Sequence, residues 1–261
     1  VRSLLASYIF SKDGNFNFEL LKNIKQFPDN SLFKQIGVDT NNEEEMYKNY
    51  INSQKIFYNK DSIRFLKTHS CFINKEGFRF TDGHNTLGVI YIVRDPRNIV
   101  SSLKNHFSLE DINAAKKFIL AKDNWVYGET GVLPTFVSSW KMHYLSWKNF
   151  PKNYLLIKYE DLLKNPSKEI IKIYNYLRKF FEFNLDDKDL DKVLKLSTFE
   201  NLKKKEKEGK FKEKLEHLKT KKKIDFFNSG PSNDWKKQLN LDLKSELEKE
   251  FSSEMRELGY M

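Results

Sequence analysis

Residues 91–107 read YIVRDPRNIVSSLKNHF, and they pass from an apolar strand through a charged turn into a helix. The run Leu87–Val93, which leads into the turn, is apolar at nearly every position, as is typical of a strand buried on both faces of a parallel sheet. Asp95 is a favoured helix N-cap residue, and Pro96 suits the first helical turn. We therefore expect Arg94 to lie where a strand ends and the positive end of a helix begins.

An arginine in that position is typical of a site for a dianion such as phosphate, because helix amides and the guanidinium both donate to it. Ser102, two helical turns further on, can donate another hydrogen bond. The alternative is a surface ion pair between Arg94 and Asp95, with Ser102 serving as a small residue where helices pack closely. This segment alone supports the two interpretations equally.

Length and composition predict one α/β domain over residues 1–261. The chain is long enough to bury a core without disulfides, and 39% of its residues are hydrophobic. Its single cysteine, Cys71, has no partner for an internal disulfide, which suits a reducing compartment and predicts a cytoplasmic location. The longest apolar run, Leu87–Val93, is too short to cross a bilayer, so we expect no membrane span.

The net charge of +10 is concentrated in residues 201–223, where eleven lysines face four glutamates and supply +7 of the total. The alternation of Lys and Glu indicates a solvated helix followed by a loop. Segments that bind nucleic acid usually have aromatic residues between their basic residues, and Phe211 is the only Phe, Tyr or Trp in residues 201–223. The pattern favours a solvated surface, so we expect no nucleic acid, and a polyanion-binding module is the alternative.

Strands are predicted in alternation with helices along the chain. The strands are expected at Arg64–Thr68, Leu87–Val93 and Tyr154–Lys158. The helices are expected at Val1–Phe10, Phe18–Gln26, Glu43–Tyr58, Pro96–His106, Leu109–Ala121, Thr135–Phe150, Tyr159–Lys164, Ser167–Phe181, Asp187–Ser197, Glu200–Leu218 and Leu241–Leu258. This alternation predicts a doubly wound parallel sheet flanked by helices, and such sheets bind ligands at the carboxyl ends of their strands.

The span YIVRDPRNIVSS, residues 91–102, resembles the 3′-phosphate-binding segment of the sulfotransferase family. Members of that family use 3′-phosphoadenosine 5′-phosphosulfate (PAPS) as sulfuryl donor, release 3′-phosphoadenosine 5′-phosphate (PAP) and require no metal. The resemblance implies that Arg94 and Ser102 bind the 3′-phosphate of the nucleotide. Further segments of this chain resemble the family in the same order.

FLKTHS, residues 65–70, resembles the family's Lys-Thr-His segment and follows a predicted strand. The resemblance implies that His69 is the base that takes a proton from the acceptor and that Lys67 stabilises the transferring group. A side chain with an ordinary pKa of about 6.5 suits deprotonation near neutrality. The alternative is that His69, one of five histidines, is a surface or core residue with no chemical role.

Two further segments are similar to parts of the family that lie at the adenine. In LLIKYEDLLKNPSKEIIKIYNYL, residues 155–177, the resemblance implies that Tyr159 lies near the adenine. In LSTFENLKK, residues 196–204, it implies the same for Ser197 and Phe199. The alternatives are a strand followed by a capped turn for the first segment and an ordinary core position for Phe199.

The segment FFNSGPSNDWKKQL, residues 226–239, resembles a loop that comes late in the family's sequence, and we call it the late loop. In the family, its usual sequence is Arg-Lys-Gly, then two residues, then Gly-Asp-Trp-Lys. Gly230 matches in register. Asn228 and Ser229 occupy the positions at which the family's Arg and Lys bind the 3′-phosphate. Asn233 occupies the position of the second glycine in the family's pattern. Asn228, Ser229 and the Gly230 amide can still donate hydrogen bonds, but we expect the loss of two cations to weaken the hold on a dianion.

VRSLLASYIF, residues 1–10, resembles the helix that directly follows the family's phosphate loop, Tyr-Pro-Lys-Ser-Gly-Thr-Thr-Trp. The resemblance implies a P-loop-like fold whose first strand and phosphate loop precede Val1. Residues 1–261 are then expected to lack the catalytic lysine of that loop, so activity of these residues by themselves is doubtful.

The interpretation we favour is a sulfotransferase that transfers a sulfuryl group from PAPS to a hydroxyl or amine of a small-molecule, carbohydrate or lipid acceptor. A non-catalytic nucleotide-binding protein of the same fold is the first alternative. A polyanion-binding module built on the lysine-rich residues 201–223 is the second. The acceptor and the oligomeric state stay open at this point.

Overall fold

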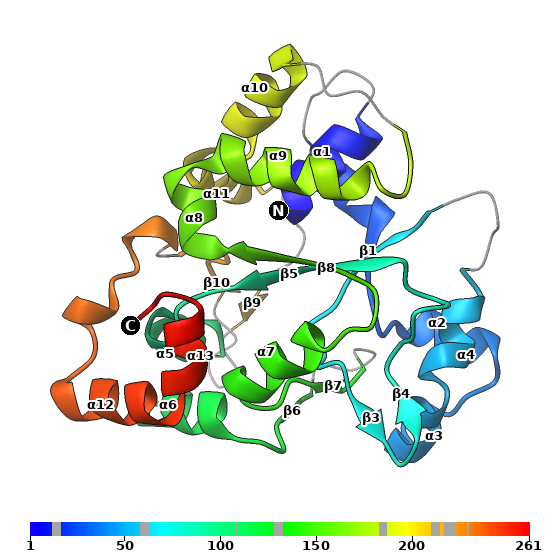
Figure 1. Cartoon of the computed structure of the whole chain (residues 1–261), viewed down its shortest axis with the longest axis horizontal. Coiled ribbons are helices and arrows are strands. Elements are labelled where there is room, and N and C mark those ends of the chain that lie inside the picture. The colour runs from blue at the N-terminus through cyan, green and yellow to red at the C-terminus, as the bar shows by residue number, and fades with distance from the viewer. Residues whose placement is uncertain are drawn as a thin grey trace.

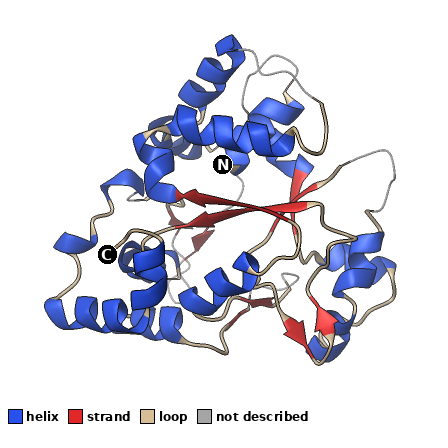
Figure 2. Cartoon of the chain, in the orientation of Figure 1, coloured by secondary structure: helices blue, strands red, loops and turns tan. Residues whose placement is uncertain are grey.

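The computed structural model describes residues 1–11, 17–57, 63–107, 109–127, 133–182, 187–209, 215–216, 223–228 and 230–261. Parallel strands run through the middle, and helices cover both sides of them (Figures 1 and 2). This arrangement is the α/β class that the sequence predicts.

Two parallel pairs of strands form the centre. β5 (Gly88–Val93) pairs with β8 (Asn153–Lys158) along the whole length of both strands. β1 (Ile24–Gln26) pairs with β2 (Phe65–Lys67). Among the described strands, no ladder joins one pair to the other, so the parallel sheet consists of two parts.

The remaining described strands form short antiparallel pairs that are separate sheets. They are β3 (Asn74–Lys75) with β4 (Phe78–Arg79), β6 (Trp125–Val126) with β7 (Thr135–Phe136), and β9 (Leu215–Glu216) with β10 (Lys223–Ile224).

Helices lie in two groups, one on each side of β5 and β8 (Figure 1). The group on one side is α1 (Arg2–Phe10), α9 (Pro166–Leu177), α10 (Asp187–Leu196) and α11 (Phe199–Lys207). The group on the other side is α5 (Pro96–His106), α6 (Ile112–Leu120), α7 (Trp140–Lys148), α12 (Leu241–Glu250) and α13 (Ser252–Glu257). Three short helices lie near β3 and β4: α2 (Asn30–Gln35), α3 (Glu43–Lys48) and α4 (Tyr50–Lys55). α8 (Tyr159–Lys164) directly follows β8, and the 3₁₀ turns are η1 (Phe18–Asn23), η2 (Gly230–Ser232) and η3 (Trp235–Lys237).

Helices lie on both faces of β5, but the cover is incomplete: Val93 is the one fully buried residue of this strand, and Ile92 is 45% exposed. Tyr91 and Val93 pack into the cluster formed with α5, α7 and α12. Ile90 faces the opposite way and packs with α1 and α9 around Ile157 of β8. Because successive side chains of a strand alternate between faces, packing partners on both faces favour apolar residues along most of its length.

Two expected helices are partly wrong. Residues 18–26 form the 3₁₀ turn η1 and then the strand β1, because Ile24–Gln26 pair with Phe65–Lys67, and this tertiary pairing overrides the local helical pattern. Residues 135–136 belong to β7, and α7 begins only at Trp140, because the Ser139 hydroxyl caps that helix by accepting from the Met142 amide.

Two other expected helices are shorter than the sequence suggests. The helix expected at residues 43–58 is interrupted at Asn49, which separates α3 from α4, and its last residue lies outside the described part of the chain. The helix expected at residues 200–218 ends with α11 at Lys207. Residues 210–214 and 217–222, which carry much of the lysine-rich segment, also lie outside the described residues.

A buried ion cluster fixes the start of α5. Asp95 caps the helix by accepting from the Arg97 amide, as expected, and its carboxylate also binds the Arg97 guanidinium at 2.6 Å. The same guanidinium contacts Glu248 of α12 at 2.5 Å and donates to the Tyr260 carbonyl at 2.8 Å. A surface pair between Arg94 and Asp95 is therefore wrong: Asp95 is buried, and its partner is Arg97.

None of the helices in the described part of the chain combines the length and apolar character needed to cross a bilayer.

We predict that Arg97→Met lowers the free energy of unfolding by about 3–5 kcal/mol, because it leaves the buried Asp95 as an uncompensated charge and removes the nearer of the two cations beside Glu248. Urea denaturation measures this loss. The matched control is Arg256→Met, an exposed arginine of α13, which we expect to change the free energy by less than about 0.5 kcal/mol. Equal effects of the two substitutions would contradict the importance of the ion cluster.

Candidate functional site

Two site residues meet at the carboxyl ends of the central strands. Arg94 follows β5 and Tyr159 follows β8, and the two strands end in register because Val93 pairs with Lys158. The Arg94 guanidinium carbon lies 4.4 Å from the centre of the Tyr159 ring, which is a cation–π contact. Arg94 Nε is buried and has no hydrogen-bond partner among the described residues. The structure thus brings these two predicted residues together and leaves a donor of Arg94 unused.

A pocket of about 340 Å³ opens beside this pair. Its lining residues come from α5, α8 and the late loop: Arg94, Asn98, Tyr159, Glu160, Leu163, Lys164, Pro231 and Asn233. The volume lies in the range of small-ligand sites.

The groups around the pocket favour an anion. Arg94 and Lys164 are cationic, whereas the two carboxylate oxygens of Glu160 already accept hydrogen bonds from the Asp95 amide and the Tyr260 hydroxyl. Burial raises the pKa of the Tyr159 hydroxyl, so it stays protonated and able to donate.

The late loop is fixed to α5 by amide hydrogen bonds. Asn233 Nδ2 donates to the Asn98 carbonyl at 2.8 Å, and the Trp235 amide donates to Asn98 Oδ1 at 2.9 Å. Ser101 Oγ donates to Asn233 Oδ1 at 2.7 Å. Asn233, which stands where the family has glycine, therefore joins the loop to the helix that follows Arg94.

The other end of the loop is fixed to α11. The buried Glu206 carboxylate accepts from the amides of Phe226 at 2.7 Å and Phe227 at 3.0 Å. Lys203 Nζ donates to the Asn228 carbonyl at 2.9 Å. Asn228 itself is exposed, and Ser229 lies outside the described residues.

Gly230 and Phe199 are in direct contact. Gly230 has a φ of +48°, and a Cβ built there would lie 2.2 Å from the Phe199 ring. Glycine is needed for both reasons, the left-handed backbone and the close approach. Ser197 also has a buried Oγ that finds no hydrogen-bond partner in the described part of the chain. Of the two residues predicted to contact the adenine, Phe199 lies against the loop that carries Gly230, and Ser197 precedes it by two residues at the start of α11.

Ser102 is exposed on α5. It follows Asn98 by four residues and so lies on the same face of the helix as this pocket residue. Sequence reasoning did not identify Asn98, although the spacing of four from Ser102 was a signal available for it.

Lys67 and His69 lie at the end of β2. The His69 side chain keeps solvent exposure, but the protein packed around it lowers its pKa to about 3, and the positive charge of Lys67 adds to this effect. His106, at the end of α5, is close enough to influence the same pKa. His69 is therefore neutral near pH 7 and can accept a proton, as a base must.

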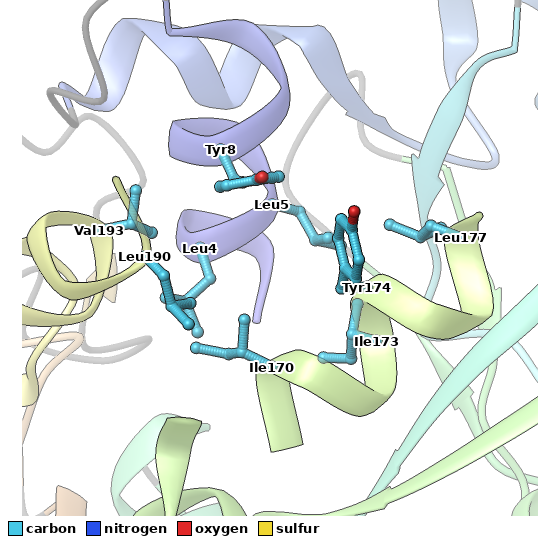
Figure 3. Close-up of a pocket in the computed structure, with 9 residues that line it drawn as sticks. All are labelled: Leu4, Leu5, Tyr8, Ile170, Ile173, Tyr174, Leu177, Leu190 and Val193. Atoms are coloured by element: carbon cyan, nitrogen blue, oxygen red, sulfur yellow. The ribbon is translucent and has the colours of Figure 1, made fainter. Parts of the chain in front are cut away.

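Two other features of the described residues bear on possible ligand sites. No group of three or more His, Cys, Asp or Glu side chains among them is placed to hold a metal ion. A small apolar pocket between α1, α9 and α10 measures about 20 Å³, too little for a nucleotide (Figure 3). It is lined by Leu4, Leu5, Tyr8, Ile170, Ile173, Tyr174, Leu177, Leu190 and Val193.

Comparison with known sequences identifies relatives. A sequence model of the sulfotransferase domain matches residues 11–259. Human sulfotransferase 2A1 is 28% identical over 174 residues, which are 65% of this chain and 57% of that protein. Mouse sulfotransferase 1 family member D1 is 25% identical over 215 residues, which are 79% of this chain and 66% of that protein. The chain therefore spans between 57% and 66% of the length of these two relatives.

Solved structures share the fold. Mouse sulfotransferase SULT7A1 complexed with PAP superposes with a TM-score of 0.52 at 20% identity, over 76% of this chain and 69% of that one. Retinol dehydratase in a complex with retinol and PAP gives a TM-score of 0.58 at 16% identity, over 97% of this chain and 76% of that one. These likenesses confirm the P-loop-like α/β architecture.

We predict that Gly230→Ala destabilises the protein more than Gly209→Ala. Both glycines have positive φ, +48° and +73°, where an L-residue costs about 1–2 kcal/mol. At Gly230 the new methyl group meets the Phe199 ring, whereas at Gly209 none of the described residues lies within 4 Å of it. Urea denaturation of both variants compares the two costs, and equal losses would mean that the contact with Phe199 carries no energy.

Proposed function

This chain belongs to the sulfotransferase family, and we propose that the protein transfers a sulfuryl group from PAPS to a hydroxyl or amine of an acceptor. The observation that carries the proposal is Arg94, a guanidinium at the carboxyl end of a central parallel strand, stacked on Tyr159 and facing an open pocket with Nε unused. A dianionic nucleotide is the ligand class that such a position binds best.

For the donor, we propose that Arg94, Ser102 and the backbone at Gly230 bind the 3′-phosphate. Tyr159, Ser197 and Phe199 are proposed to contact the adenine. The contact between Phe199 and Gly230 supports a joint role, because it brings a side chain proposed to contact the adenine against the late loop, which is proposed to bind the phosphate. Both solved relatives described above contain PAP in their complexes.

The late loop is expected to hold the phosphate without the two cations that the family has at positions 228 and 229. Asn228 is neutral, and the proposal assigns Asn228 and Ser229 only hydrogen bonds to the nucleotide. Arg94 then carries the largest share of the charge interaction with the 3′-phosphate.

For the chemistry, His69 takes the proton from the acceptor hydroxyl as the acceptor oxygen attacks sulfur. The new oxygen–sulfur bond forms while the sulfur–oxygen bond to the nucleotide phosphate breaks, and PAP leaves. Lys67 stabilises negative charge on the transferring group. As in phosphoryl transfer, the protein acts mainly by holding the reactants in line and by stabilising charge.

For the acceptor, we propose a small-molecule hydroxyl or amine, with carbohydrate and lipid hydroxyls as further classes. Relatives include a guinea pig 3-beta-hydroxysteroid sulfotransferase, 27% identical, and a rabbit amine sulfotransferase, 30% identical. Androsterone, which is present in one solved relative, is a suitable test acceptor. The proposal includes a single domain over residues 1–261 and a cytoplasmic location, which the single, buried Cys71 supports.

A second candidate is a non-catalytic nucleotide-binding protein of the same fold. The observation in its favour is Asn228, a neutral residue where the family has a cation. Both candidates require PAP binding, and they differ in whether His69 matters for turnover.

We predict that Arg94→Ala weakens PAP binding by about 10- to 100-fold, the loss expected for a charge-assisted hydrogen bond. Isothermal titration calorimetry with PAP measures the change in Kd. The control is Arg79→Ala, an exposed arginine of β4, which we expect to leave Kd within about twofold. A similar small effect at Arg94 would place the nucleotide elsewhere and reject the proposed register.

We predict that His69→Ala lowers kcat by about 10²- to 10⁴-fold, the range for loss of a general base, and leaves PAP affinity unchanged. The assay follows PAP formation with androsterone, 4-nitrophenol and a primary amine as acceptors, on protein that includes any residues encoded before Val1. The control is His84→Ala, an exposed histidine. Binding of PAP without turnover in either protein would favour the non-catalytic candidate.

A further inference from the structure

Helix α7 holds the backbone on both sides of the proposed reaction centre. Trp140 Nε1 donates to the Arg94 carbonyl at 3.1 Å, next to the proposed phosphate anchor. His143 Nε2 lies 3.2 Å from the His69 carbonyl, the backbone of the proposed base. Trp140 and His143 are three residues apart and so share one face of the helix. The same helix therefore contacts the backbone of Arg94, which is proposed to bind the donor nucleotide, and the backbone of His69, which is proposed to deprotonate the acceptor.

Further contacts from α7 secure the residues that follow His69. Trp147 Nε1 donates to the Ser70 carbonyl at 2.8 Å. Ser146 Oγ accepts from the Phe72 amide at 3.0 Å. The helix thus fixes three neighbouring points of the loop by hydrogen bonds, and loops fixed in this way hold their side chains within narrow limits.

His143 makes its contact in one defined tautomer. The His69 carbonyl can only accept, so Nε2 of His143 carries the proton, and Nδ1 accepts from the Tyr91 hydroxyl at 2.9 Å. Burial lowers the pKa of His143 to about 4 and raises that of Tyr91, so both groups are neutral at physiological pH. Tyr91 belongs to β5, and His143 therefore also joins the His69 loop to the strand that ends at Arg94.

We propose that His143 is a positioning residue: through its hydrogen bonds to the His69 carbonyl and Tyr91, it sets the place of His69 relative to Arg94. The role of His69 as a base in this inference rests on the function proposed above. His143 itself does not touch the reacting atoms. Its neutral ring acts only through the backbone, and the effect on rate follows because a displacement of a base by about 1 Å can cost 10²-fold in rate.

The test compares two substitutions of His143. His143→Phe keeps an aromatic ring but removes the donor, and we expect kcat to fall at least tenfold while the Kd for PAP stays within twofold. His143→Gln keeps an amide donor, and we expect it to recover part of the lost kcat. Met142→Leu, an exposed neighbour, is the control with no expected effect. Thermal unfolding checks that each variant is folded, and an unchanged kcat in folded His143→Phe would overturn the inference.

A second measurement separates this inference from the proposed function. Imidazole ¹⁵N NMR follows the pKa of His69 directly, without an acceptor. Release of the loop moves His69 away from the protein packed around it and from Lys67, so its pKa should rise toward the ordinary value in His143→Phe, and the acid limb of the kcat/KM profile should move to higher pH. If His69 titrates identically with and without His143, the positioning role is rejected. If His69→Ala retains full turnover, the proposed base is rejected instead, and the NMR result still decides whether His143 positions the loop.

Discussion

The pairing of β5 with β8 is the constraint on which the rest of the structure depends. Its register brings the residues after the two strands, Arg94 and Tyr159, to the same edge, where the guanidinium stacks on the ring. A shift of one residue would turn each side chain to the other face of the sheet and separate the two groups. α5 and α8 both start at this edge, so the pocket exists only because the register holds.

α5 connects that edge to the remaining parts of the molecule. Its first turn contains Arg97, which binds the C-terminal helices, and Asn98, which binds the late loop. The late loop lacks the cations that its family usually places there, yet Asn233 gives it hydrogen bonds to α5 that a glycine cannot make. Here the side-chain amides position the loop, and Arg94 supplies charge from a different segment.

Much of this edge could be predicted from sequence because its signals are local. The apolar run into β5, the Asp95 cap and the span of α8 are read within a few neighbouring residues. β1 could not be predicted, because three residues carry no periodicity and become a strand only by pairing with a segment about forty residues away. The same limit applies to His143: nothing near it in sequence reveals that its ring lies between Tyr91 and His69, since tertiary packing creates both contacts.

The ion cluster at Arg97 also determines when, during translation, α5 can form its final ionic contacts. Its contacts to Glu248 and the Tyr260 carbonyl span 151 and 163 residues of sequence. On a ribosome, β5, β8 and the helices between them emerge long before those partners, and they can begin to pack as a nascent unit. Arg97 can bind these partners only after the residues up to Tyr260 have been synthesised, so the helix that supports the proposed phosphate site reaches its final ionic environment well after the strands beside it have formed.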